Sequence, residues 1–252
     1  HESSEMASEF IRGKIREIVK DPATAELLCP KDYSFNGKRV PTGYGYYETY
    51  NLPHVRLVDV KTTPITEFTK NGLKVGDTEY ELDFIICATG FDAMTGNLTG
   101  LDIVGRNGKV LREKFAEGYI GGNMGISYNG FPNFMVALGP QTPYSNLPVP
   151  IQLGAQWMAD AISFARDNGI EELEATPESE EWWAAESERA GKATVMYEQG
   201  KKAKAWFMGD NVPGKPQQLQ VYMGGGGVYQ DYCRQAKKEG FLSFRAPEFI
   251  KT

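Results

Sequence analysis

Two turns of small residues follow apolar runs of strand length, and both could let a flat cofactor approach the backbone. Thr89 and Gly90 come directly after residues 84–88, and Gly139 comes directly after residues 134–138. Ligands of α/β sheets commonly bind beyond the carboxyl edge of a strand, where a glycine leaves room for them. A tight turn that binds nothing is an equally good interpretation of Thr89 and Gly90 on spacing alone.

The loop at residues 139–147 leads into a helix that begins near Pro148. The free N–H groups and the positive dipole end of a helix N-terminus suit an electron-rich group, such as the edge of a reduced flavin. The more common interpretation of such a loop is an ordinary connection, in which Ser145 or Asn146 only caps the helix.

Two further segments carry side chains that could contact a ligand. Lys38 and Arg39 form a basic pair, in which the lysine offers a point charge for a phosphate and the arginine a planar, permanent cation. Most such pairs are nevertheless solvated surface charges. Trp206 runs into a turn that contains asparagine, glycine and two prolines. Its indole could stack on a ligand ring or a ribose, or it could pack in the core.

The composition excludes several classes of function. The chain has 252 residues and a net charge of −6, which argues against non-specific nucleic-acid binding. No apolar run approaches the roughly 20 residues of a membrane-spanning helix. Two histidines leave little material for a catalytic triad or a metal site, so we expect no metal and chemistry carried by a cofactor. Three widely spaced cysteines indicate a reducing, cytoplasmic setting.

Apolar residues of helical period predict several helices. The expected helices cover residues 6–19, residues 23–28, residues 148–168, a segment that starts at Thr176-Pro177, and residues 229–238. The helix that begins near Pro148 should end at Asn168-Gly169. Its expected buried stripe is Ile151, Ala155, Met158, Ile162 and Ala165.

Short strands are expected between these helices. Alternation predicts a strand at residues 55–60, and two turns with glycine predict a small β-meander over residues 65–81. Residues 84–88 and 134–138 are apolar on both faces, so we expect buried strands there, with Cys87 inside the first. Helices mixed with buried strands indicate an α/β fold. The glycines of residues 121–125 do not form a dinucleotide fingerprint, which needs G-x-G-x-x-G between a strand and a helix.

Taken in order, these segments resemble the C-terminal portion of the Baeyer–Villiger monooxygenases, flavoenzymes that use NADPH and O₂ to convert ketones to esters or lactones. The likeness runs along nearly the whole chain and is carried by residues 46–51, 55–59, 81–83, 88–93, 130–133, 146–147, 206, 213–216 and 222–225. Many flavoproteins share the Ala-Thr-Gly strand end. The Lys38-Arg39 loop and the segment from Trp206 to Pro-Gly-Lys-Pro are more specific to this family.

The resemblance implies a role for each matching residue. Arg39 matches the family's active-site arginine, whose charge stabilises the flavin peroxide and the anionic intermediate of ketone attack. Lys38 matches a position that favours NADPH through its 2′-phosphate, and Trp206 matches a tryptophan that contacts the nicotinamide cofactor. The backbone of Leu147 would face the flavin, while Tyr144 and Leu147 would line the ketone pocket. The other cofactor contacts expected for FAD and NADPH are Thr89, Gly90, Gly139, Gln141 and Asn146.

The resemblance also implies an incomplete enzyme. Residues 1–54 would be the end of an NADP-binding domain, and residues 55–252 the C-terminal part of an FAD-binding domain, with a helical region at 148–200 and a tail. The family's two dinucleotide fingerprints are absent, so we expect a missing N-terminal half on the same polypeptide or on a separate chain. The first residues, which do not resemble a translation start, point the same way. A self-contained domain cut at that point is the alternative.

The substrate and the reaction remain open between three interpretations. The resemblance implies a cyclic ketone that is converted to a lactone with O₂ and NADPH, because the loop at residues 141–143 is short compared with that of the phenylacetone-type enzymes of the family. A flavin monooxygenase that oxygenates amines or sulfur is the nearest alternative. A catalytically silent binding module with the same fold is the third, since a fold alone does not establish a function.

Overall fold

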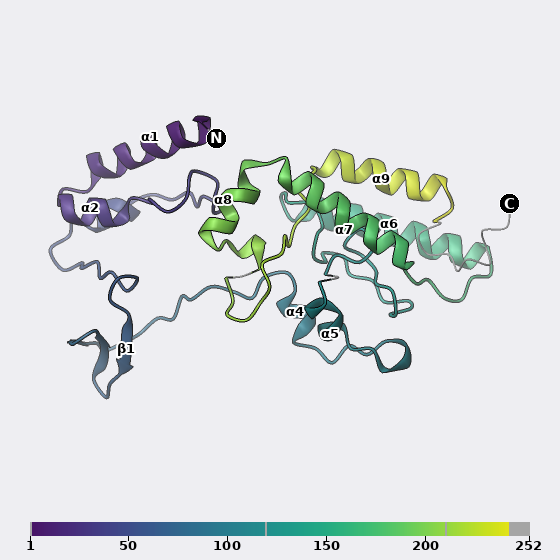
Figure 1. Cartoon of the computed structure of the whole chain (residues 1–252), viewed down its shortest axis with the longest axis horizontal. Coiled ribbons are helices and arrows are strands. Elements are labelled where there is room, and N and C mark those ends of the chain that lie inside the picture. Colours follow the sequence, from purple (N-terminus) through teal and green to yellow (C-terminus); the bar gives the residue numbers. More distant parts are fainter. Residues whose placement is uncertain (1, 119, 210, 242–252) are drawn as a thin grey trace. The chain divides into compact units, whose positions relative to one another are not determined.

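The computed structural model describes residues 2–118, 120–209 and 211–241, which divide into two compact units (Figure 1). The first unit comprises the residues up to Phe35 and residues 39–91, and the second comprises residues 36–38 and those from Asp92 onward. The end of the predicted C-terminal tail, residues 242–252, lies outside the described residues.

Helices and one small sheet make up the two units, so helices and strands are mixed as expected. The first unit contains α1 (Glu2–Ile18), α2 (Pro22–Leu28), α3 (Tyr46–Thr49), β1 (Ile65–Phe68), β2 (Gly72–Val75) and β3 (Thr78–Glu81). The second contains α4 (Gly96–Thr99), η1 (Arg106–Gly108), α5 (Leu111–Ala116), α6 (Pro148–Asp167), α7 (Pro177–Lys192), α8 (Val195–Ala203), η2 (Trp206–Met208) and α9 (Gly226–Lys238). Each helix predicted from apolar spacing is confirmed.

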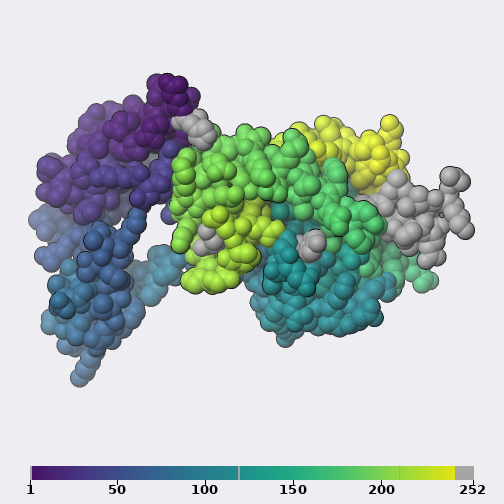
Figure 2. All heavy atoms as spheres, in the orientation of Figure 1, coloured from purple at the N-terminus to yellow at the C-terminus, as the bar shows by residue number. Residues whose placement is uncertain are grey.

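An apolar face joins α1 to α2, which lie side by side in Figures 1 and 2 (purple). The buried residues between them are Ile15, Val19, Ala25 and Cys29. The start of α2 is fixed by Asp21, whose side chain accepts a hydrogen bond from the N–H of Thr24 at 2.8 Å. Such a cap satisfies one of the N–H groups that a helix N-terminus leaves free.

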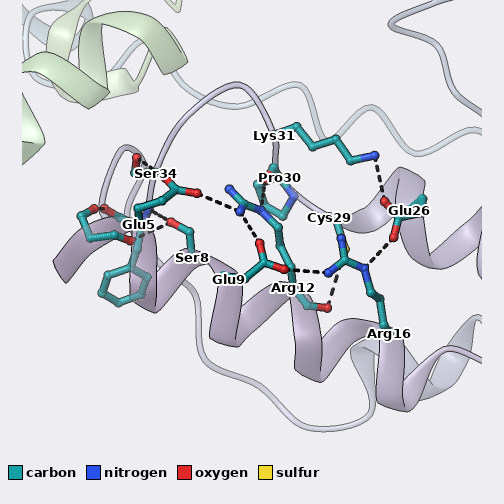
Figure 3. A network of polar contacts seen from close by, with 12 residues as sticks. Glu5, Ser8, Glu9, Arg12, Arg16, Glu26, Cys29, Pro30, Lys31 and Ser34 are labelled. Carbon is teal, nitrogen blue, oxygen red and sulfur yellow. Dashed lines mark hydrogen bonds and ion pairs between the residues drawn. The ribbon is translucent and has the colours of Figure 1, made fainter. Parts of the chain in front are cut away.

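A chain of alternating charges runs along α1 and crosses to α2 (Figure 3). Arg12 pairs with Glu5 and Glu9, and Arg16 bridges Glu9 at 2.9 Å and Glu26 of α2 at 2.6 Å. The hydrogen bond from Arg16 lowers the pKa of Glu26 to about 2. Because this pKa is depressed, the stabilisation is complete at neutral pH and is lost as the pH falls through about 2.

The predicted β-meander is confirmed as an antiparallel sheet in the order β1-β2-β3. Val75 pairs with Ile65 of β1 and with Thr78 of β3. Gly72 is required at its position, because a Cβ there would lie 1.9 Å from the carbonyl oxygen of Tyr80. This close approach of two backbones explains one glycine of the turn pattern.

Three predicted strands are wrong for the described part of the chain. Residues 55–60 and 84–88 form no strand there, and residues 134–138 make only an isolated bridge through Met135. The side chains of Phe84 and Ile86 are each 89% exposed, and Cys87 is exposed rather than buried. An apolar run predicts that a segment will be buried, but it does not predict a partner. A strand forms only where a neighbouring strand exchanges hydrogen bonds with it.

The core of the second unit lies between α6, α7 and α9, of which α6 and α9 run beside each other (Figure 1). The predicted stripe of α6 is displaced by one residue. Its buried residues are Pro150, Gly154, Trp157, Ala161 and Ala165, so only Ala165 was placed correctly. Both faces of α6 carry apolar residues, and the face with the large Trp157 and the small Gly154 packs more closely.

The described residues also bear on membranes and metals. None of their helices combines the length and the apolar composition that crossing a membrane requires. Among the same residues, no three histidine, cysteine, aspartate or glutamate side chains gather into a group that could hold a metal ion.

Replacing Leu111 by alanine should lower the free energy of unfolding by about 2–5 kcal/mol, because this residue of α5 is fully buried against Phe115 and Tyr128. Denaturant unfolding of the full-length protein measures the change. Leu101→Ala is the matched control, since Leu101 is 57% exposed, and should change the value by no more than about 0.5 kcal/mol. Equal losses in the two variants would contradict this core.

Candidate functional site

The loop at residues 139–147 is held in place by a second segment, residues 218–222. Gln141 donates its N–H to the carbonyl of Gln220 at 2.7 Å, and Tyr144 donates to the carbonyl of Tyr222 at 2.8 Å. Tyr222 in turn donates to the carbonyl of Thr142 at 2.9 Å. These backbone bonds give the loop a defined shape, although it belongs to no helix or strand.

A platform of glycines supports the same loop from within. A Cβ on Gly139 would lie 2.1 Å from the carbonyl oxygen of Gly125, and one on Gly125 would lie 2.7 Å from that of Pro140. Gly139 is therefore needed for contact with the protein itself. The Gly-rich run at residues 121–125, which is no dinucleotide fingerprint, has the structural task of letting these backbones meet.

Segment 218–222 also binds the residues around Trp206. Gln218 donates its N–H to the carbonyl of Met208, and Gln220 donates to that of Phe207, both at 2.8 Å. Trp206 is half-buried, while Phe207 and Met208 are fully buried in the core. Phe207 and Met208 therefore fill the core at this point, and part of Trp206 remains exposed.

Tyr144 and Trp206, two residues predicted from the sequence, are brought together. Their ring centroids lie 6.2 Å apart with an angle of 41° between the planes, and Phe207 lies 6.1 Å from Tyr144. Both rings are partly exposed. A half-exposed aromatic pair of this kind offers apolar surface to a ring-shaped ligand.

The N-terminus of α6 is open. Leu147 occupies the N-cap position without a side-chain cap and is 56% exposed, and Asn146 is exposed beside it. Pro148 and Pro150 have no N–H, and the N–H groups of Val149 and Ile151 bond to the carbonyls of Asn146 and Leu147, so this 20-residue helix offers a ligand its positive dipole end and not free donors. These features fit the electron-rich edge of a flavin.

Gln141 differs from its neighbours, because its side chain points into the protein. It is 4% exposed, and its Nε2 donates to the carbonyl of Leu219 at 3.2 Å. Its φ of +62° is unusual for a residue with a side chain and helps the loop to turn. Its N–H is bonded to Gln220 as well, so Gln141 gives the loop its shape from within the protein.

The other predicted residues are exposed. Arg39, Thr89 and Gly90 belong to the first unit, and Lys38 belongs to the short segment that groups with the second. A Cβ on Gly90 would meet nothing within 4 Å, and its φ of +94°, which residues with a side chain disfavour, explains this glycine. The roles of these four residues remain predictions.

Lys215 fixes the loop that follows Trp206, a role that the sequence did not reveal. Its ammonium group forms an ion pair with Asp92 and donates to Oγ1 of Thr95 at 2.6 Å. Thr95 is buried, so the contact ties the loop to the body of the second unit. The Pro-Gly-Lys-Pro pattern was the available signal, but its partner lies more than a hundred residues earlier.

The characterised proteins to which this chain is similar are monooxygenases. Cyclohexanone 1,2-monooxygenase of an Acinetobacter species is 41% identical over 239 residues, which cover 94% of this chain and 43% of that protein. Phenazine N-monooxygenase of Lysobacter antibioticus is 37% identical over 249 residues, or 97% of this chain and 45% of that protein. No protein-family model matches the chain.

Solved structures narrow the class. The crystal structure of cyclohexanone monooxygenase from Rhodococcus sp. Phi1 bound to NADP⁺ matches with a TM-score of 0.91 and 36% identity, over 97% of this chain and 45% of that one. The OTEMO complex with FAD and NADP gives 0.89 and 38%, over 97% and 44%. The resemblance to a C-terminal portion of the Baeyer–Villiger monooxygenases is confirmed. The chain spans less than half the length of these relatives.

Replacing Lys215 by methionine should speed amide hydrogen exchange in residues 211–217, because the ion pair and the hydrogen bond to Thr95 are lost together. An increase of about 3- to 10-fold corresponds to the net worth of one such bond. Exchange is measured by mass spectrometry on the full-length protein. Lys238→Met is the control, because Lys238 is an exposed residue of α9, and it should leave the exchange rates of these amides unchanged. Faster exchange in both variants, or in neither, would show that Lys215 does not hold this loop in place.

Proposed function

We propose that this chain is the C-terminal part of an FAD- and NADPH-dependent Baeyer–Villiger monooxygenase that converts a cyclic ketone and O₂ to a lactone. The similarity to cyclohexanone 1,2-monooxygenase, 41% over 94% of the chain, carries this proposal. The open N-terminus of α6 and the pair of Tyr144 and Trp206 support it, because they suit the ring systems of the two cofactors and a small ketone.

Four residues would act on the substrate and the cofactors. Bound FAD and NADPH supply the oxygen transfer and the reducing equivalents. Arg39 provides a planar guanidinium cation, which stabilises negative charge on the reacting oxygen atoms. Tyr144 and Leu147 line the ketone pocket, and Trp206 contacts the nicotinamide.

The remaining predicted residues would hold the cofactors. Thr89 and Gly90 allow close approach of the backbone, and Asn146 and the backbone of Leu147 face the flavin. The buried Gly139 and Gln141 give the loop that meets the cofactor its shape. Lys38 supplies a positive charge for the 2′-phosphate of NADPH.

We further propose that residues 1–54 complete an NADP-binding domain and residues 55–252 complete an FAD-binding domain. The missing N-terminal half would carry both dinucleotide fingerprints, on the same polypeptide or a separate chain. The exposed run at residues 84–91 supports this, because Phe84, Ile86 and Phe91 are each at least 87% exposed. Apolar side chains in such a row favour a covered position in the complete protein. The cytoplasmic setting predicted from the cysteines remains a prediction.

N-oxygenation is a second candidate reaction, favoured by the 37% identity to a phenazine N-monooxygenase. Its substrate is a flat aromatic nitrogen compound, as the name of that relative states. The same aromatic pair of Tyr144 and Trp206 would suit such a ring. The two reactions share the cofactors and differ in the atom that receives oxygen.

Arg39→Ala in the complete enzyme should lower the rate of lactone formation by about 100- to 1,000-fold, as expected for loss of a group that stabilises developing negative charge. Arg39→Lys should recover only part of the rate, since a compact ammonium does not replace a planar guanidinium. Arg56→Ala is the matched control, because Arg56 is an exposed arginine of the same unit. Lactone formation at the wild-type rate by Arg39→Ala would refute the assigned role.

Incubating the complete, FAD-loaded protein with NADPH and one of three substrates should separate the reactions. Cyclohexanone should yield its lactone, detected by mass spectrometry, faster than phenazine or a thioether is oxygenated. N-oxide or sulfoxide without lactone would replace the proposal by the second candidate or by sulfur oxygenation. If the complete protein binds no FAD during loading and stays colourless, or binds it and oxidises none of the three substrates, the chain belongs to a silent module.

A further inference from the structure

Glu186 is a buried carboxylate of α7, 8% exposed, that none of the steps above uses. Its Oε1 accepts hydrogen bonds from the phenols of Tyr222 at 2.9 Å and Tyr232 at 3.0 Å. Arg189 donates to both of its oxygens at 2.6 and 2.8 Å. Burial of a carboxylate costs free energy unless it is paired, so its contribution lies in the groups that it fixes.

The protonation states of Glu186 and Tyr222 determine which of them donates in the hydrogen bond between them. The hydrogen bond from Arg189 lowers the pKa of Glu186, and the phenols add to this effect, so Glu186 is ionised at neutral pH and only accepts. Burial raises the pKa of Tyr222, and its bond to Glu186 raises it further, so the phenol keeps its proton and donates. Hydrogen bonds from a hydroxyl to a carboxylate are stronger than those between neutral groups.

Tyr222 transmits this fixation to the loop. Its backbone N–H binds the carbonyl of Thr142, and its carbonyl binds the N–H of Tyr144, so one residue holds both sides of Pro143. Its ring packs on Trp183 with centroids 4.8 Å apart. Its hydroxyl occupies the space that a side chain at position 224 would need, because a Cβ on Gly224 would lie 2.0 Å away. The phenol is thus bonded to Glu186, packed on Trp183 and close to the backbone of Gly224.

We propose that Glu186 is a positioning residue that, through the phenol of Tyr222, sets the loop at residues 141–144 and thereby the place of Tyr144 opposite Trp206. This inference rests on the proposed function, in which these two rings contact the ketone and the nicotinamide. Segment 218–222 also binds the two residues that follow Trp206. The segments that carry Tyr144 and Trp206 are therefore hydrogen-bonded to the same stretch of backbone.

The test compares two variants that each remove one phenol from the same carboxylate. Tyr222→Phe keeps the ring against Trp183 but loses the hydroxyl that orients the loop. Tyr232→Phe removes the other hydroxyl, and Tyr232 lies on α9 with no backbone bond to the loop among the described residues. If the phenols only stabilised the negative charge of Glu186, removing either hydroxyl would have the same effect on KM and on amide exchange.

In the complete, FAD-loaded enzyme, Tyr222→Phe should raise KM for cyclohexanone by about 3- to 10-fold, the net worth of one hydrogen bond, with kcat nearly unchanged. A larger share of NADPH should be consumed without lactone. Amide exchange in residues 139–147 should accelerate by a similar factor. Tyr232→Phe should change each of these quantities by a clearly smaller factor, because Tyr232 shares the Glu186 oxygen but makes no backbone bond to the loop among the described residues. Glu186→Gln, whose amide oxygen still accepts, should be milder than Glu186→Ala.

Equal effects of the two phenylalanine variants, or no effect of Tyr222→Phe on both KM and exchange, would overturn the positioning role. Thermal unfolding of each variant identifies one that fails to fold, and the milder Glu186→Gln then decides through KM. If the wild-type enzyme oxidises no ketone, the proposed function fails. Exchange in residues 139–147, which needs no substrate, then decides the positioning role alone.

Discussion

One short stretch of backbone, residues 218–222, determines the shape of the candidate site. It binds the loop at residues 139–147 on one side and residues 207–208 on the other through main-chain hydrogen bonds, to which the side chain of Gln141 adds one bond to the carbonyl of Leu219. The two segments lie far apart in the sequence; the first belongs to no helix or strand, and the second is part of the short 3₁₀ helix η2. Because both are bonded to the same segment, Tyr144 and Trp206 come together at a defined distance instead of moving independently.

The surroundings of this stretch explain why its side chains are so restricted. Glycines at 125 and 139 allow the loop to touch the backbone beneath it, and Gly224 makes room for the Tyr222 hydroxyl. Fully buried aromatic rings, among them Trp183 and Phe207, fill the space around it. The outcome is a rigid support with only a few groups, such as Leu147, left exposed towards a ligand. A rigid support of this kind is what a site needs when it must hold two cofactors and a substrate in a fixed relation.

The sequence predicted local features well and long-range features poorly. Helix ends follow from caps such as Thr176, and the meander follows from its turns, since both depend on neighbouring residues. The run at residues 84–88 was misjudged because no strand among the described residues pairs with it, so its apolar side chains stay exposed. The buried face of α6 was misjudged because the helix buries the face that carries Gly154 and Trp157, and not the neighbouring face with the predicted apolar stripe. Of the site, Tyr144 and Trp206 were found through family resemblance, whereas Glu186 looks like any glutamate of an acidic helix.

A crystal structure of the complete enzyme with FAD and NADP⁺ tests the central claim most directly. We expect the hydrogen bonds of residues 218–222 to persist, the flavin ring to lie against the N-terminus of α6 at Leu147, and the guanidinium of Arg39 to face the flavin. An Arg39 side chain in open solvent, or a flavin bound away from Leu147, would contradict the account.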